Sequence, residues 1–135
     1  MFNRKLTSDS FSNLIAEGST IDGKVQFTGI IKIQGTVNGD IICNVPQGDK
    51  AKLDDCIIVD KSGVVTSDSM TSSNMIISGK VTSKKIWAEN TLRILKTANI
   101  RGALIYYRTL EMEPGAMLHE CQLKHLDHSS EGEVV

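Results

Sequence analysis

Aromatic residues are scarce in this sequence, and so is proline. Phe, Trp and Tyr make up 4% of the 135 residues, which leaves few side chains on which nucleic-acid bases could stack. The net charge is −1, so the chain has no general electrostatic attraction to nucleic acids. Two prolines are too few for a proline-rich linker. We therefore expect one domain with no nucleic-acid partner.

Cysteine usage and hydropathy indicate a reducing, intracellular environment. Cys43, Cys56 and Cys121 are odd in number and lack CxxC spacing, which is untypical of a disulfide framework. No apolar run approaches the roughly 18 residues of a membrane span, and the N-terminus lacks the apolar stretch of a signal peptide. We expect a cytoplasmic protein.

The sequence does contain an unusually long alternation of apolar and polar residues. From Ile21 to Cys43 every odd position is apolar or glycine, and the even positions are polar except for Ile30 and Ile42. A period of two indicates a strand with one buried face. Strands usually have about 3–10 residues, so one straight strand cannot explain the pattern.

The same stretch also repeats every six residues, which indicates a solenoid of short strands joined by tight bends. Glycine at inward-facing corners would leave room for the bends. The residues that share the spacing are Ile15, Ile21, Phe27 and Ile33, and likewise Gly23, Gly29 and Gly35. Antiparallel hairpins are the competing interpretation, but the alternation continues through both candidate turns, Asp22–Gly23 and Asn38–Gly39.

We therefore predict an all-β fold, a single-stranded parallel β-helix over residues 14–123. At roughly 17 residues a coil it would have about six coils, stacked at the strand spacing of roughly 4.8 Å. Residues 1–13 are predicted to be a flexible N-terminal tail and residues 124–135 a flexible polar C-terminal tail. The segment Pro46–Lys52 is predicted to be a loop that leaves one coil.

Three segments, taken in order, resemble the bactofilins, a family of bacterial cytoskeletal proteins. The segments are Leu14–Ile41 (LIAEGSTIDGKVQFTGIIKIQGTVNGDI), Leu92–Leu104 (LRILKTANIRGAL) and Leu110–Leu118 (LEMEPGAML). The resemblance implies a right-handed, roughly triangular β-helix and nucleotide-independent filaments that scaffold cell-envelope or cell-shape machinery. Glu120 stands where the family usually has glycine, and Leu118 stands where it usually has a large aromatic residue.

An open solenoid exposes unpaired backbone groups and an apolar cross-section at each end. Soluble solenoids usually cover these ends with capping elements, and the sequence shows none. We expect end-to-end stacking, with Leu14 and Ile15 at one end and Met117, Leu118 and Leu123 at the other. The alternative is that these residues fill the core while the tails fold over the ends.

The N-terminus has the composition of a small membrane foot. Met1 and Phe2 would enter the interface, and Arg4 and Lys5 would attract anionic headgroups. A polymer repeats the foot many times, so weak single contacts add up to firm binding. We expect a position at the inner face of the cytoplasmic membrane; the alternative is an ordinary disordered terminus.

The positions of the residues capable of acid–base or metal chemistry argue against an enzyme. β-Helix acyltransferases and γ-class carbonic anhydrases need a wall histidine, and no histidine occurs before His119. His119, Cys121, His125 and His128 match no firm zinc spacing. Asp54–Asp55 lacks an acid–base partner and is interpreted as a solvated turn. We expect no catalytic residues, no cofactor and no metal, and the acyltransferase remains a minor alternative.

A further alternative is a non-polymerising adaptor whose walls bind a peptidoglycan synthase or hydrolase. The outward residues Ile30 and Ile42 are candidate contacts, although scattered apolar residues are common on protein surfaces. Of Tyr106 and Tyr107, one is expected to point inward and one outward.

Overall fold

The computed structural model describes residues 12–43 and 55–126, and the regular elements in these ranges are all β-strands. The strands are β1 (Asn13–Ile15), β2 (Thr20–Asp22), β3 (Val25–Phe27), β4 (Ile30–Ile33), β5 (Thr36–Asn38), β6 (Ile41–Cys43), β7 (Cys56–Val59), β8 (Val64–Ile77), β9 (Lys80–Ile94), β10 (Asn99–Arg101), β11 (Leu104–Tyr107), β12 (Thr109–Met112), β13 (Met117–His119) and β14 (Gln122–His125).

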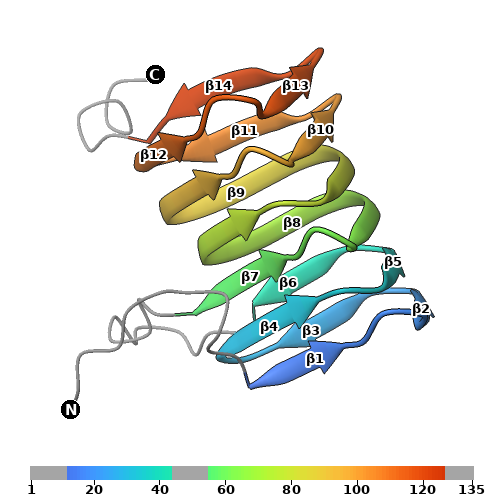
Figure 1. Ribbon diagram of the computed structural model, residues 1–135. Coiled ribbons are helices and arrows are strands. Elements are labelled where there is room, and N and C mark those ends of the chain that lie inside the picture. Colours follow the sequence, from blue (N-terminus) through green and yellow to red (C-terminus); the bar gives the residue numbers. More distant parts are fainter. Residues whose placement is uncertain (1–11, 44–54, 127–135) are drawn as a thin grey trace.

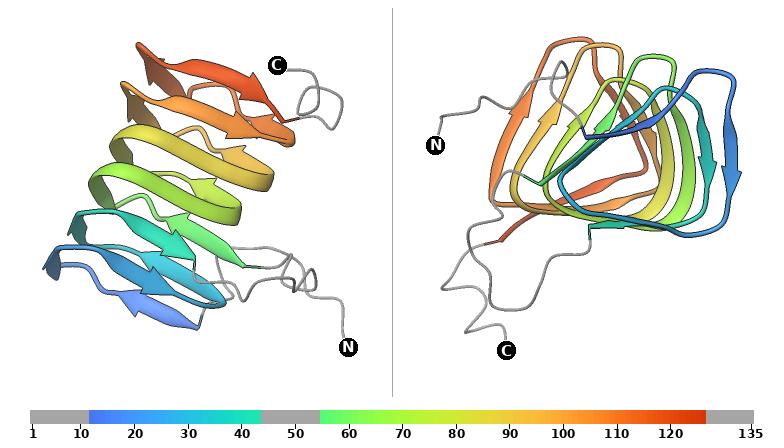
Figure 2. Two further views of the ribbon diagram at one scale, coloured as in Figure 1. Left: turned by 180° about the vertical axis from the view of Figure 1, so that it is seen from behind. Right: turned by 90° about the horizontal axis from the view of Figure 1, so that it is seen from below.

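The strands form a β-solenoid of six coils, shown from the side in Figure 1, and every pairing between its described strands is parallel. Seen from below, in Figure 2, each coil has three walls around a common interior. Except between the second and third coils, partners on adjacent coils are 16 to 19 residues apart, as in the pair Val65 and Val81. The predicted parallel β-helix of about six coils is confirmed, and the hairpin alternative is wrong.

Each wall takes one strand segment from every coil. The first wall contains β1, β4, β7, residues 74–77 of β8, residues 91–94 of β9, and β12. The second wall contains β2, β5, residues 64–67, residues 80–83, β10 and β13. The third wall contains β3, β6, residues 69–72, residues 85–88, β11 and β14. β8 and β9 are long because each continues around two corners.

Three aliphatic ladders of the core, one behind each wall, contain one residue from every coil, and a further ladder behind the first wall is Ile31–Ile57–Met75–Leu92–Leu110. In-register stacking makes such ladders possible, because a parallel pairing places like positions directly above one another. The first three ladders are Ile15–Ile33–Val59–Ile77–Ile94–Met112, Ile21–Val37–Val65–Val81–Ile100–Leu118 and Val25–Ile41–Met70–Ile86–Ile105–Leu123. We call each residue of a ladder a rung, and all the rungs between the two end coils are buried.

Glycine makes one corner tight, and of the predicted glycines only Gly35 lies there, while Gly23 is exposed. Gly35, Gly63 and Gly79 lie on successive coils where the first wall turns into the second, and all three are buried. A Cβ atom on Gly79 would overlap the carbonyl oxygens of Asp60 and Gly63. A larger residue there would push neighbouring coils apart.

One departure from regular spacing marks the change from the second coil to the third. Ile31 pairs with Ile57, a separation of 26 residues instead of 16 to 19. The predicted loop Pro46–Lys52 falls in this interval and lies outside the described residues.

Two interpretations of individual residues are wrong. The alternation predicts that Ile30, an even position, lies on the surface, but Ile30 is 6% exposed and packs in a second apolar cluster. The sequence predicts that Asp55 belongs to a solvated turn, but Asp55 is 3% exposed. Its carboxylate accepts hydrogen bonds from Gly29 N at 3.2 Å and Cys43 Sγ at 3.2 Å, so it joins the second and third coils.

Candidate assembly interface

The last coil leaves the three ladders open. Met112, Leu118 and Leu123 are the final rungs, and we call them the C-terminal end face. Met112 is 44% exposed and Leu123 is 41% exposed, although both occupy inward positions. Ile94 and Ile105, the rungs beneath them, have no exposed surface. Inward-pointing apolar side chains without a next coil present the solenoid cross-section to solvent.

The backbone at this end is open as well. Among the described residues β12, β13 and β14 each pair on one side only, with β9, β10 and β11. Their outer N–H and C=O groups form an edge that another coil could pair with.

The first coil is the corresponding surface at the opposite end of the stack. Ile15, Ile21 and Val25 are the first rungs, which we call the N-terminal end face. Within the described chain, β1, β2 and β3 pair only with β4, β5 and β6. Ile21 and Val25 are half-buried, while Ile15 is 7% exposed. This end is apolar but less exposed than the C-terminal end face.

The predicted contact residues divide into two groups. Ile15, Leu118 and Leu123 are ladder rungs on the two end faces. Leu14 and Met117 alternate with them and point outward, and each is 48% exposed. These two residues lie at the rim of the solenoid ends, beside the cross-section.

The sequence reasoning missed Met112, Ile21 and Val25. All three are ladder rungs in the end coils, and carrying the period of two through to both ends of the repeat would have identified them. The Pro-Gly turn at Pro114–Gly115 separates Met112 from the next wall, which obscured that it belongs to the last coil.

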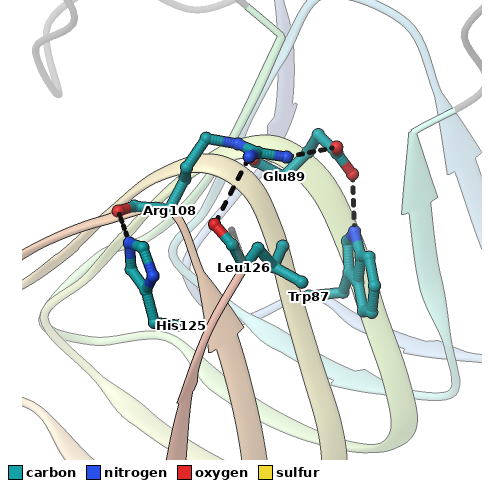
Figure 3. Close-up of polar contacts among 5 residues, drawn as sticks. All are labelled: Trp87, Glu89, Arg108, His125 and Leu126. Atoms are coloured by element: carbon teal, nitrogen blue, oxygen red, sulfur yellow. Dashed lines mark hydrogen bonds and ion pairs between the residues drawn. The ribbon is translucent and has the colours of Figure 1, made fainter. Parts of the chain in front are cut away.

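Polar contacts bind the end of β14 to the coils beneath it (Figure 3). Arg108 Nη1 donates to the carbonyl oxygen of Leu126 at 3.3 Å, and its Nη2 pairs with Glu89 Oε2 at 3.3 Å. Trp87 Nε1 donates to Glu89 Oε1 at 2.8 Å, which orients that carboxylate. His125 Nε2 lies 3.0 Å from Arg108 O, so the end of β14 is bound to the coil below.

Glu120 has a strained backbone at the same end. Its φ is +58°, the left-handed region that glycine occupies readily and other residues seldom do. It lies at the corner between β13 and β14, at the position where the bactofilin resemblance would place glycine. A glutamate is therefore held in a conformation that the packing of the last coil imposes.

Cys43 and Cys56 are poorly suited to thiol chemistry. Burial raises the pKa of Cys56 to about 12, and burial followed by the hydrogen bond to Asp55 raises the pKa of Cys43 to about 12. The nucleophilic thiolate is therefore rare in both at neutral pH.

Residues 12–43 and 55–126 contain no group of three His, Cys, Asp or Glu residues able to hold a metal ion. His128 lies outside these ranges. The described part of the chain contains no helix that could span a membrane.

Fold and site together define an open-ended parallel β-solenoid with an apolar cross-section at each end. The family model for bactofilin, described as polymer-forming cytoskeletal, matches residues 13–122. The chain belongs to the bactofilin family, and it is a polymer-forming cytoskeletal protein. Comparison with curated proteins found no match.

A solved structure has the same fold. It is the cryo-EM reconstruction of bactofilin double helical filaments from Thermus thermophilus, with a TM-score of 0.64 and 18% sequence identity. The match covers 83% of this chain and 99% of that chain. At this identity the likeness shows the fold alone.

Proposed function

We propose that the protein polymerises end to end, without nucleotide, into filaments that scaffold cell-envelope or cell-shape machinery. The observation that carries the proposal is the exposure of inward ladder rungs, above all Met112 and Leu123, beside strands that pair on one side only. Stacking another subunit there continues the ladders and pairs the free edges. The filaments of the Thermus thermophilus relative support the same use of the fold.

Burial of apolar surface is the proposed driving force of this assembly. Each square ångström of apolar surface removed from water contributes about 25 cal/mol, and the newly paired strand edges add hydrogen bonds. No step of this association needs hydrolysis to proceed. The test is negative-stain electron microscopy with a sedimentation assay, in buffer without nucleotide or metal. Thin unbranched filaments are expected; a uniform monomer or small oligomer would refute end stacking.

The filaments are proposed to lie at the inner face of the cytoplasmic membrane, bound through Met1, Phe2, Arg4 and Lys5. These residues lie outside the described part of the chain, and the proposal depends on their composition. Each basic residue near an anionic surface contributes about 1 kcal/mol, so one subunit binds weakly and a polymer binds firmly.

Co-sedimentation with anionic vesicles tests the membrane foot. Deleting residues 1–8 should release the protein from vesicles while filaments persist, and Arg4→Gln with Lys5→Gln should weaken binding and reduce its dependence on salt. Unchanged vesicle binding by the deletion variant would contradict the foot and leave end stacking untouched.

The outer third wall is the best candidate for binding a partner such as a peptidoglycan synthase or hydrolase. Trp87 and Tyr106 stack there with ring centroids 4.7 Å apart, and Lys85 Nζ lies 5.4 Å from the Trp87 ring centroid. Tyr106 is thus the outward tyrosine, while Tyr107 packs against the core, as the sequence predicted. Changing Trp87 and Tyr106 to Ser should leave filaments intact and abolish capture of the partner.

A further inference from the structure

A second apolar cluster lies on the outside of the first wall. Side chains alternate across a strand, and Ile57, Ile77 and their neighbours in register belong to the interior ladders or core. The residues between them must therefore point outward. Those residues form a separate buried cluster of Ile30, Cys56, Ile58 and Ile76, with Leu95 packed against it.

These outward side chains are far more buried than outward side chains elsewhere. Ile58 is 1% exposed and Cys56 has no exposed surface, whereas the outward Val64 of the second wall is 37% exposed. Ile58 has Lys32 on one side and Ile76 on the other in the sheet. Sheet neighbours shield the flanks of a side chain and leave its tip uncovered, so this cluster needs a segment lying across the wall.

We propose that this outer cluster is the docking site for the N-terminal segment, residues 1–11, of the same chain. The segment carries Met1, Phe2, Leu6 and Phe11, which include two of the three phenylalanines of the protein. The interior ladders of the described chain begin at Ile15, and the apolar residues of this segment match the aliphatic character of the outer cluster. The segment's own placement lies outside the described residues.

The point at which the described chain begins favours this occupant. Ser12 N donates to the carbonyl oxygen of Ile30 at 2.9 Å, and Ile30 N donates to Ser12 Oγ at 3.0 Å. The N-terminal segment therefore starts beside a member of the cluster. Eleven extended residues reach about 36 Å, whereas the coils from Ile30 to Leu95 span roughly 15 Å.

Docking gives the N-terminus two alternative apolar environments, because the same segment contains the proposed membrane foot. Met1 and Phe2 cannot enter a bilayer and cover the wall at the same time. A subunit in solution would keep its foot against its own first wall.

The accessibility of the Cys56 thiol shows directly whether the outer cluster is covered. In a full-length chain with Cys43→Ser and Cys121→Ser it is the sole thiol, and the rate of maleimide labelling at neutral pH measures how often the cluster is uncovered. The test variant adds Phe2→Ser, Leu6→Ser and Phe11→Ser. The matched control adds Arg4→Gln and Lys5→Gln instead, which removes charge from the same segment and keeps its apolar residues. Both are measured with Leu118→Asp present, so that filaments do not shield the wall.

Labelling at least tenfold faster in the serine variant, with the control unchanged and circular dichroism identical, is the expected result. Equal rates in the serine variant and the parent would overturn the proposal, because residues 44–54 or another element would then be the cover. A parental rate that falls as protein concentration rises would also overturn it, since a second copy would be the occupant.

A crosslinking experiment keeps the proposal testable should the serine variant lose its structure. The substitution Leu6→Cys is introduced into the chain in which Cys56 is the sole thiol, and the protein is oxidised with copper phenanthroline. A disulfide between the introduced thiol and Cys56 within one chain supports docking, and its absence contradicts it.

Discussion

Leu118 of the last coil lies in register with Ile100 of the coil before it, on the same ladder. Ile100 also has Val81 on its other side and is fully buried, whereas Leu118 has no strand partner beyond it in the described chain. The two residues occupy equivalent positions and differ in whether a next coil exists. In the proposed end-to-end stacking, the next subunit would supply that coil.

A charge at Leu118 should therefore prevent assembly without unfolding the subunit. In Leu118→Asp, stacking would desolvate a carboxylate at every junction that buries this end, at a cost of several kcal/mol. The expected result is soluble protein with an unchanged circular dichroism spectrum and no pelleted polymer. Thr82→Asp is the matched control, because Thr82 is exposed on the second wall away from both ends. Filaments of normal length from Leu118→Asp would remove this residue from the contact.

Glycine at position 120 should stabilise the subunit. A left-handed backbone costs a non-glycine residue roughly 1–2 kcal/mol, and the added freedom of glycine in the unfolded chain offsets part of the gain. We expect Glu120→Gly to raise the free energy of unfolding by about 0.5–1 kcal/mol. Chemical denaturation in the Leu118→Asp background measures it without a contribution from polymer. Glu120→Ala is the control and should show no gain, because alanine keeps the backbone strain.

Alanine at position 79 should destabilise the stack strongly. The new Cβ atom would overlap two backbone carbonyl groups, and backbone can yield only by separating coils. Overpacking of this kind costs about 3 kcal/mol. Gly18→Ala is a useful comparison: no atom lies within 4 Å of the place its Cβ would take, but its φ is +90°. It should cost about 1 kcal/mol, from backbone strain alone. Equal losses in the two variants would contradict the crowding at Gly79.

Stability should fall at alkaline pH, in part because of Cys56. Its pKa rises from an ordinary value of 9.0 to about 12 in the folded state, so between these values the unfolded chain loses the thiol proton and the folded chain keeps it. The unfolded state then binds fewer protons, and stability decreases as pH rises, by up to about 1.4 kcal/mol per unit. Denaturation midpoints measured from pH 8 to 11 should fall less steeply in Cys56→Ala than in the parent. Parallel slopes would mean that Cys56 does not contribute.

Much of the interior could be predicted from the sequence, because the inward positions of a parallel solenoid follow from local side-chain alternation. The alternation from Ile21 to Cys43 places the core residues Phe27, Ile31, Ile33, Val37 and Ile41 correctly, and Gly35 occupies a crowded corner, whereas Gly23 is exposed. Stacking repeats the same environment on each coil, so a short pattern carries information about the whole core.

The period of two does not predict the burial of a residue that is covered by, or bonded to, another part of the chain. Ile30 is outward by alternation but buried by something that covers the wall, and Asp55 is buried because it bonds two coils across a corner. Neither result follows from the period of two, which specifies the side of a wall and not what lies against it.

By itself, therefore, the sequence determined a parallel β-helix with aliphatic ladders, because side-chain alternation and glycine spacing are local properties of the chain. Tertiary structure alone decided which rungs end the ladders, how exposed they are and which outward residues are covered. Met112 is an interior residue by pattern and a surface residue by position, since the stack stops at the coil that contains it. The end of the stack is a property of the folded molecule, and the proposed assembly depends on it.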